Sequence, residues 1–232
     1  MTTTLITGAN KGIGYETARQ LIERGHSVIL GARDIGRGEK AARQLGARFV
    51  QLDISNDASV EAACADIERH EGGVDVLINN AGVLGPRDVP MADVTAVEAA
   101  EVFQTNLLGT IRMIHTFLPM LKRSENAVVV NVSSKMGSFA TVTDPSAPEN
   151  IYPLPYYQVS KAALNMLTLK YAEAYPGMRF NAADPGGTDT DIMDHLGTQT
   201  LAEGSEAIVT LATIASDGPS GIFLNRDGIV PW

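Results

Sequence analysis

The stretch Thr3-Thr-Leu-Ile-Thr7-Gly8-Ala-Asn10-Lys11-Gly12-Ile13-Gly14 decides the fold of this chain. A short β-branched run leads into a turn with three glycines, and a helical pattern over residues 14–24 follows at once. Glycines let such a turn approach a phosphate group closely, and the N-terminus of the following helix favours negative charge. We therefore expect a phosphate-binding turn here, with an ordinary strand-to-helix turn as the alternative. Its predicted contact residues are Gly8, Asn10, Lys11, Gly12, Ile13 and Gly14.

The glycine spacing separates this turn from two common phosphate-binding patterns. It does not match the G-x-G-x-x-G pattern of many dinucleotide-binding proteins. It also departs from the G-x-x-x-x-G-K-[ST] loop of nucleoside triphosphatases, because Lys11 precedes Gly12 instead of following it. A nucleoside triphosphatase is therefore disfavoured.

Short apolar runs and longer helical patterns alternate from one end of the chain to the other. Strands are expected at residues 3–7, 27–30, 48–52, 74–78, 127–132, 178–182 and 221–224. Helices are expected at 14–24, 36–45, 58–69, 155–175 and 202–215, and several helical stretches within 93–121. Strands this apolar are typical of a parallel sheet that is buried on both faces. We predict a single α/β domain over residues 1–232, with a doubly wound, Rossmann-type parallel sheet of about seven strands and helices on both faces.

Composition excludes several classes of function. The formal net charge is −9 and the chain has no lysine and arginine block, so nucleic acid is not an expected partner. Cys64 is the only cysteine and the four histidines show no paired ligand spacing, so no disulfide framework and no metal site are expected. Neither a leader-like N-terminus nor an apolar run of about 18 residues is present, so the expected compartment is the cytoplasm, without membrane contact.

Tyr157 and Lys161 lie four positions apart on the helix predicted to start at Pro155, and therefore share one helix face. A positive charge near a phenol lowers its pKa by roughly 1–3 units, toward the range of a general acid or base. Tyr156 is an equally good phenol, but Ser160 stands four residues after it and carries no charge. The pair predicts proton transfer by Tyr157, although an exposed helix face would show the same spacing.

Basic residues at the end of the second predicted strand indicate which dinucleotide binds. NAD sites usually place an acidic residue there, against the ribose 2′-hydroxyl, but this chain has Ala32 followed by Arg33. With Arg37 and Lys11, Arg33 could bind a 2′-phosphate, which favours NADP(H) over NAD(H). Asp53 follows the third strand, where it could accept a hydrogen bond from an adenine amino group or cap the next helix.

Six motifs occur in the order seen in the short-chain dehydrogenases/reductases, and the chain resembles that family throughout. They are Thr7-Gly8-x-x-x-Gly12-x-Gly14, Asn79-Asn80-Ala81-Gly82, Asn106, Asn131-Val-Ser-Ser134, Tyr157-x-x-x-Lys161 and Pro185-Gly186. The glycine turn and Ala32-Arg33-Asp34-x-x-Arg37-Gly38 look especially like the NADPH-dependent carbonyl-reductase branch. The resemblance implies a catalytic tetrad of Asn106, Ser134, Tyr157 and Lys161.

The tetrad implied by the resemblance has definite roles. Ser134 would hydrogen-bond the substrate oxygen that Tyr157 protonates, and Lys161 would hold the nicotinamide ribose. Asn106 would shape its helix and position a water for proton resupply. Ser134 is chosen over Ser133 because the second serine is catalytic in the family, and because strand alternation points the two to opposite sides.

The resemblance also implies cofactor contacts away from the glycine turn. Asn80, Ala81 and Gly82 would stabilise the sheet and contact the adenosine side, and Tyr157 and Lys161 would contact the nicotinamide side. The turn at Pro185 and Gly186, with Thr188 acting through its backbone and Thr190 through its hydroxyl, would hold the carboxamide. Asp184 could contact the cofactor or only cap this turn.

Two segments, at about residues 135–155 and 186–204, are the expected substrate loops. A ketone, aldehyde or quinone, or an alcohol in the reverse reaction, would pack against Met136, Phe139, Tyr152 and Met193. The distance from Ser134 to Tyr157 is longer than is common in the family, yet shorter than the large insertion of monomeric carbonyl reductases, and a homodimer or homotetramer is favoured. The alternative function is a non-catalytic NADP-sensing regulator of the same fold.

Overall fold

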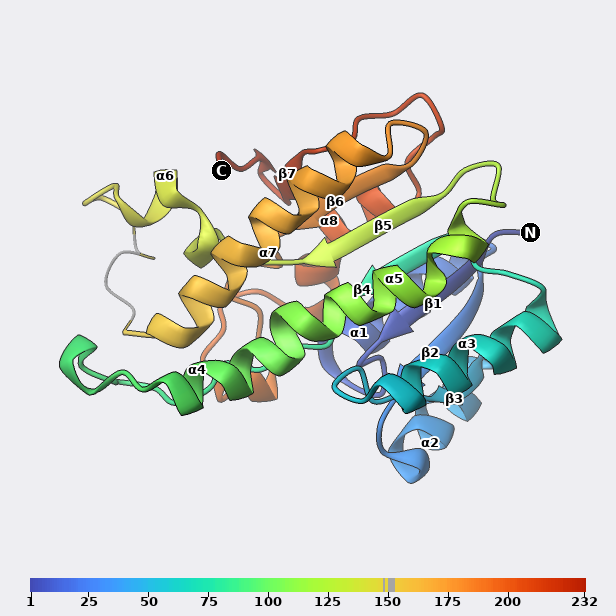
Figure 1. Ribbon diagram of the computed structural model, residues 1–232, viewed down its shortest axis with the longest axis horizontal. Coiled ribbons are helices and arrows are strands. Elements are labelled where there is room, and N and C mark those ends of the chain that lie inside the picture. Colours follow the sequence, from blue (N-terminus) through green and yellow to red (C-terminus); the bar gives the residue numbers. More distant parts are fainter. Residues whose placement is uncertain (148, 150–152) are drawn as a thin grey trace.

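A computed structural model describes residues 1–147, 149 and 153–232 of the chain. Within these residues the strands form an eight-stranded sheet in the order β3-β2-β1-β4-β5-β6-β7-β8, with β7–β8 the antiparallel pair. The strands are β1 Thr3–Thr7, β2 Ser27–Ala32, β3 Arg48–Gln51, β4 Val76–Asn79, β5 Val128–Val132, β6 Arg179–Ala183, β7 Phe223–Asn225 and β8 Gly228–Ile229. Figure 1 shows helices on both sides of the twisted sheet.

The helices alternate with the strands along the chain. The α-helices are α1 Gly12–Glu23, α2 Ile35–Leu45, α3 Asp57–Glu71, α4 Ala96–Phe103, α5 Thr110–Leu121, α6 Phe139–Val142, α7 Pro155–Ala174 and α8 Leu201–Ala212. A π-helix, η2 Gln104–Gly109, joins α4 to α5, and 3-10 turns lie at η1 Met91–Asp93, η3 Lys135–Gly137 and η5 Asp191–Met193.

Alternate residues of each strand pack against opposite helical layers. Leu5, Leu77 and Val129 belong to the core that includes α3 and α5, against which α7 also packs. Their neighbours Ile6 and Ile78 belong to the core formed with α1, α2 and α8. Because fully burying such a side chain contributes roughly 1.5–3 kcal/mol, the two cores together hold both helical layers on the sheet.

The structure confirms the predicted doubly wound parallel sheet with helices on both faces. The two-residue strand β8 is additional, and forms a hairpin in which the Asp227 amide donates to the Asn225 side chain. The helical stretches expected from residue 93 to 121 are α4 and α5, which the π-helix at Gln104–Gly109 joins. The expected substrate loops, at about residues 135–155 and 186–204, contain the short elements α6 and η5.

The carboxyl ends of β1, β4, β5 and β6 meet at one edge of the sheet, because these strands are parallel neighbours. The order of connection reverses between β1 and β4, which is where ligands bind in open α/β sheets. The glycine turn and the segments containing Asn80, Ser134 and Pro185 all leave the sheet at this edge. Across the described ranges, no helix combines the length and the apolar character needed to cross a bilayer.

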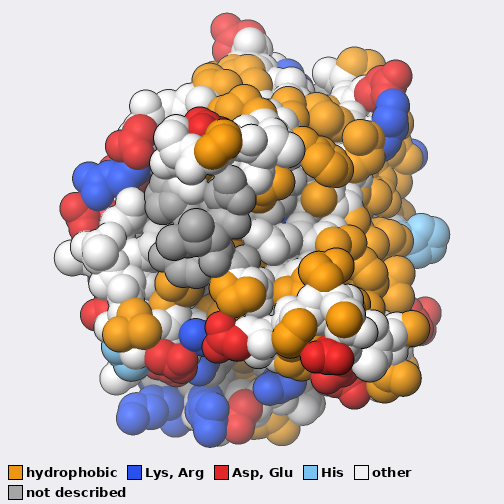
Figure 2. All heavy atoms as spheres, turned by 90° about the vertical axis from the view of Figure 1, so that its left-hand side faces the viewer, with side chains coloured by type: hydrophobic (Ala, Val, Ile, Leu, Met, Phe, Trp, Pro, Cys, Tyr) orange, Lys and Arg blue, Asp and Glu red, His pale blue; other side chains and the backbone are white. Residues whose placement is uncertain are grey.

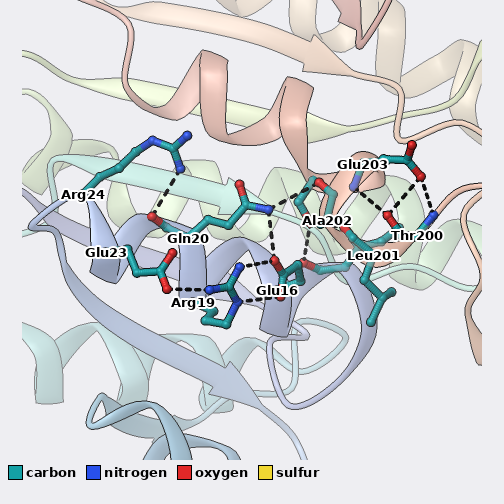
Figure 3. A network of polar contacts seen from close by, with 11 residues as sticks. Glu16, Arg19, Gln20, Glu23, Arg24, Thr200, Leu201, Ala202 and Glu203 are labelled. Atoms are coloured by element: carbon teal, nitrogen blue, oxygen red, sulfur yellow. Dashed lines mark hydrogen bonds and ion pairs between the residues drawn. The ribbon is translucent and has the colours of Figure 1, made fainter.

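The helix α8 closes the segment 186–204 with a capping box. Thr200 accepts from the Glu203 amide, and the Glu203 carboxylate accepts from the Thr200 amide in return. The Gln20 side chain of α1 donates to the Ala202 carbonyl, and Figure 3 shows this contact beside the ion pairs of Arg19 with Glu16 and Glu23. The N-terminus of α8 is therefore fixed against α1.

We expect Thr200→Ala to lower the free energy of unfolding by about 1 kcal/mol, because the cap is lost. Thr210→Ala, on the exposed side of the same helix, is the matched control and should be neutral or stabilising by a few tenths, since alanine is the better helix former. Urea unfolding followed by circular dichroism measures both. Equal midpoints for the two variants would show that the capping box contributes nothing.

Candidate active site

The glycine turn is tightly hydrogen-bonded to the end of β4. Gly8 and Gly12 have φ angles of +65° and +60°, which side chains rarely adopt. A Cβ atom on Gly14 would lie 2.5 Å from the side-chain nitrogen (Nδ2) of Asn80, and this nitrogen donates to the Thr7 carbonyl at 2.9 Å. The Thr7 hydroxyl accepts from the amides of Asn80 and Ala81, at 3.0 Å each. Asn80 and Ala81 therefore hold the turn in place.

The start of α1 can accept an anion. Lys11 occupies the N-cap position, but its side chain makes no cap hydrogen bond to the first turn. Backbone N–H groups at such a helix start lack intrahelical partners and favour negative charge. Lys11 instead pairs with Asp191 of the segment after β6, and a Cβ atom on Gly12 would lie 3.9 Å from the Thr190 side chain. The glycine turn and the segment after β6 thus lie side by side at the start of α1.

Arg33 and Arg37 lie near the carboxyl end of β2. Arg33 is exposed, and Arg37 lies 3.8 Å from the Asp34 carboxylate. The Asp53 carboxylate accepts from the amide and hydroxyl of Ser55, and these bonds, with the nearby charge of Arg33, lower its pKa. The N-cap of α3 is Asn56, so the structure rules out the alternative in which Asp53 caps that helix.

Tyr157 and Lys161 lie on the same face of α7, as their spacing predicts. The Lys161 amine is 5.4 Å from the centroid of the Tyr157 ring and donates to the Val132 carbonyl at 2.7 Å. Lys161 is 4% exposed, and this burial lowers its pKa to about 8. The Tyr156 hydroxyl lies elsewhere, donating to Glu98 and accepting from the Thr95 amide.

The expectation that Lys161 lowers the pKa of Tyr157 is wrong for this structure. Burial raises the pKa of the phenol well above its ordinary value, and the charge of Asp184 raises it further. A hydrogen bond with Ser134 opposes these effects but does not reverse them. The phenol is therefore protonated at neutral pH, in the state that can donate a proton.

The two candidate serines have different surroundings. The Ser133 hydroxyl is buried and donates to the Asn165 side-chain oxygen on α7. Ser134 is partly exposed, hydrogen-bonds Tyr157 and accepts from the Met136 amide at 3.2 Å. The serine that faces Tyr157 is thus Ser134, which sequence analysis preferred.

Asn106 lies in the π-helix and joins three segments of the site. Its side-chain nitrogen donates to the Val83 carbonyl and to the Ser160 hydroxyl, and its oxygen accepts from the Val83 amide. A Cβ atom on Gly82 would lie 3.4 Å from that oxygen and 3.8 Å from the Lys161 amine. Glycine at this position therefore leaves space between the two groups.

The turn after β6 presents Thr190 and buries Thr188. The Thr188 hydroxyl donates to the Pro185 carbonyl and lies against Gly204, whereas Thr190 remains partly exposed. Gly186 has a φ of +66°, and a Cβ atom placed on it would lie 2.8 Å from the side-chain amide of Gln199. Because the Thr188 hydroxyl is engaged within the protein, this residue can offer its backbone to a bound molecule, and the hydroxyl of Thr190 stays the predicted contact.

Asn165 is a structural contributor that sequence analysis missed. It holds Ser133 and donates to the Gly137 carbonyl, so that it fastens the turn carrying Ser134 onto α7. A Cβ atom on Gly137 would lie 2.5 Å from the Lys161 backbone, which shows how closely η3 packs there. The available signal was its position four residues after Lys161, on the same helix face.

Comparison with known proteins gives consistent matches along the chain. A family model described as short chain dehydrogenase matches residues 2–201. (−)-Isopiperitenone reductase of Mentha piperita is 33% identical, with 96% of each chain covered. (+)-Neomenthol dehydrogenase of Capsicum annuum is 31% identical, with 96% of this chain and 95% of that one covered. The NADPH-bound carbonyl reductase from chicken fatty liver has a TM-score of 0.88 and 29% identity, covering 100% of this chain and 99% of that one.

We expect Ser133→Ala to lower the free energy of unfolding by about 2 kcal/mol, because the buried Asn165 oxygen loses its donor. Ser134→Ala should cost less than about 1 kcal/mol, since Ser134 is partly exposed and water can replace its hydroxyl at the Met136 amide. Chemical denaturation of both variants measures the difference. A larger loss for Ser134→Ala would contradict the hydrogen-bond assignment.

Proposed function

The chain belongs to the short-chain dehydrogenase family and is similar to its carbonyl-reductase branch, and we propose that it reduces a ketone, aldehyde or quinone with NADPH, or oxidises the alcohol in reverse. The observation that carries this proposal is the position of Tyr157, which lies close enough to the Ser134 hydroxyl for that group to lower its pKa and has the buried amine of Lys161 5.4 Å from its ring centroid. Asn106 completes the set behind them.

The surfaces around the site fit a dinucleotide. Gly8 and Gly14 let the turn pack closely against Asn80 and Ala81, Gly12 leaves space at the start of α1 where a pyrophosphate would bind, and Gly82 leaves space near Lys161. Asp53 and Asn80 border the adenosine side, whereas Pro185, Gly186 and Thr190 border the nicotinamide side. When bound, NADPH supplies the hydride that adds to the carbonyl carbon.

The protein's own groups stabilise charge and supply the proton. The hydroxyls of Ser134 and Tyr157 hydrogen-bond the carbonyl oxygen, where negative charge develops during reduction. Tyr157 then donates its proton to that oxygen, and its raised pKa keeps this proton available at neutral pH. Lys161, charged below a pKa of about 8, offsets the negative charge left on the phenol and holds the ribose hydroxyls.

A preference for NADPH rests on Lys11, Arg33 and Arg37. Arg33 is exposed just after β2, and its charge helps to lower the pKa of Asp53. Arg33 therefore lies near the expected adenosine position. Lys11 pairs with Asp191, and its ammonium group has further N–H donors that a phosphate could accept from. The NADPH in the chicken carbonyl reductase structure supports the same choice.

An apolar substrate is favoured by the side chains at this end of the molecule. Met91, Phe139 and Leu196 are 75%, 69% and 77% exposed, and they lie in the segments that follow β4, β5 and β6. Figure 2 shows hydrophobic side chains over much of the face on which α4 and α6 lie. Of the predicted packing residues, Tyr152 lies outside the described residues. The names of similar proteins mention menthone and neomenthol, so cyclic ketones like menthone are the first substrates to test.

The alternative function is a non-catalytic NADP sensor of the same fold. A sensor has no use for a phenol held protonated beside a serine and a buried amine. The nearness of Ser134 and Lys161 to Tyr157, with Asn106 bound to Ser160 on the same helix, supports an enzyme instead.

We expect Tyr157→Phe to lower kcat for NADPH-dependent reduction by about 10²–10⁴-fold, because the proton donor is removed. Tyr156→Phe is the matched control and should keep turnover within a few-fold, since its hydroxyl contacts only Thr95 and Glu98 among the described residues. NADPH absorbance measures both. Equal turnover by Tyr157→Phe and wild type would refute the acid role, and tight NADPH binding without turnover by wild type would favour the sensor.

We expect Arg33→Ala to raise KM for NADPH by about tenfold or more while changing KM for NADH less than about twofold, because only NADPH carries the 2′-phosphate. Arg43→Ala removes an exposed arginine that pairs with Glu39 on α2, and it should change neither value. Steady-state kinetics with both cofactors measures the effect. Equal losses for NADPH and NADH would exclude a phosphate contact.

A further inference from the structure

Residues 230–232 follow the β7–β8 hairpin and are held firmly on the sheet. The Val230 amide donates to the Phe223 carbonyl of β7 at 2.8 Å. The Val230 side chain is 3% exposed and packs with Ala182 of β6 and with Phe223. The Trp232 ring stacks on the ring of Phe223, with centroids 5.3 Å apart and an angle of 25° between the planes. Segment 230–232 is therefore fixed to β6 and β7, and β6 leads into the proposed nicotinamide turn.

The same segment is hydrogen-bonded to the start of α6, beside which Figure 1 shows the mark C. The Ser138 hydroxyl donates to the Pro231 carbonyl at 2.7 Å. The Ala140 amide donates to the Trp232 carbonyl at 3.2 Å. Ser138 is fully buried and is the N-cap of α6, where its hydroxyl also accepts from the Thr141 amide at 3.1 Å. One buried hydroxyl thus caps α6 and fastens it to the segment.

The helix α6 depends on such contacts for its position. It is a single turn of four residues, Phe139–Val142, all of them described and none of them buried. An isolated turn is unstable in water, because its first hydrogen bond must fix several residues at once. A turn without a buried side chain also gains little from packing on the sheet. Within the described residues, α6 is therefore placed by the adjoining η3 turn and by its hydrogen bonds to segment 230–232.

Phe139, one of the predicted substrate-packing residues, stands between the two residues that bond to segment 230–232. Its neighbours Ser138 and Ala140 each donate to that segment, whereas the Phe139 side chain is 69% exposed. Phe139 follows shortly after Ser134 in the chain, and the η3 turn between them packs on α7. An exposed aromatic ring held next to this turn can contact the apolar part of a carbonyl substrate.

We propose that segment 230–232 is a brace that positions Phe139 for substrate binding, and that Trp232 is its positioning residue. This inference rests on the proposed function and extends it to the apolar part of the substrate. Stacking on Phe223 fixes the backbone of Trp232, whose carbonyl receives the Ala140 amide. Loss of the indole ring frees that carbonyl, so the Phe139 ring is no longer held in one place. Substrate binding then weakens, whereas the proton donor on α7 keeps its position.

Removing the indole ring separates substrate binding from the chemical step. We expect Trp232→Ala to raise KM for menthone about fivefold or more while kcat changes less than about twofold, because a binding contact is lost and the proton donor is kept. Trp232→Phe keeps a ring that can stack on Phe223, and should bring KM back to within about twofold of wild type. Ile229→Ala is the matched control, because its side chain is 66% exposed on β8, and it should change neither constant.

A double substitution shows whether Trp232 acts through Phe139. Phe139→Ala removes the ring itself and should raise KM for menthone by a similar factor. Adding Trp232→Ala to Phe139→Ala should then raise KM less than about twofold further, because coupled residues are not additive. If Trp232→Ala fails to fold, Ser138→Ala removes the contact with the Pro231 carbonyl from the other side, and the same rise in KM is expected.

Hydrogen exchange follows the brace without any turnover. Peptides covering residues 138–143 should exchange about tenfold faster or more in Trp232→Ala than in wild type, because the Ala140 amide loses its acceptor. Peptides from β5 should exchange alike in both proteins, since the sheet is unchanged.

The outcomes separate the brace from the proposed function. Unchanged exchange over residues 138–143 in Trp232→Ala would overturn the brace. Faster exchange with an unchanged KM would overturn its role in substrate binding, and fully additive effects of Trp232→Ala and Phe139→Ala would overturn action through Phe139. Faster exchange in Trp232→Ala, when the wild-type protein reduces no carbonyl, would instead overturn the proposed function, while the contact between segment 230–232 and α6 would stand.

Discussion

The pairing of β5 with β6 is the constraint on which the site depends. Its register places Val132 beside Ala183, so that the serine turn and the turn after Ala183 leave the sheet together. The same strand end offers the Val132 carbonyl to the buried amine of Lys161. A slip of one residue would send each side chain to the opposite face and separate these groups. The serine turn, the turn after Ala183 and the amine of Lys161 therefore come together because of one strand register.

A buried polar network keeps α7 aligned with that register. Asn79 of β4 donates to Asn131 of β5, which donates to Thr168 of α7, each at 2.9 Å. Nearer the site, Asn165 holds both Ser133 and the Gly137 carbonyl. Buried polar groups are costly unless paired, so these bonds favour one placement of the helix on the sheet. The placement of α7 on the sheet therefore sets the positions of Tyr157 and Lys161.

Local patterns predicted the parallel sheet, the glycine turn and the shared helix face of Tyr157 and Lys161, because periodicity and turn chemistry are written in neighbouring residues. The π-helix around Asn106 and the hairpin of β8 depend on tertiary packing, and spacing alone did not reveal them. The raised pKa of Tyr157 was missed because burial outweighs the nearby ammonium, and burial is known only once the chain is folded. The Asp184 carboxylate accepts from the amides of Lys135 and Gly186, which lie 49 and 2 residues away in the sequence. No local pattern shows that one side chain contacts both the serine turn and the turn after β6.

Carbonyl reduction with NADPH is the central claim, and transfer of labelled hydride tests it most directly. The protein would be incubated with a cyclic ketone and NADPH deuterated at one or the other face of C4, and the alcohol analysed by mass spectrometry and NMR. The proposed function predicts deuterium on the carbinol carbon from one of the two labelled cofactors, and none on that carbon from D2O with unlabelled NADPH. Alcohol without cofactor deuterium, or no alcohol from any ketone, aldehyde or quinone tested, would contradict it.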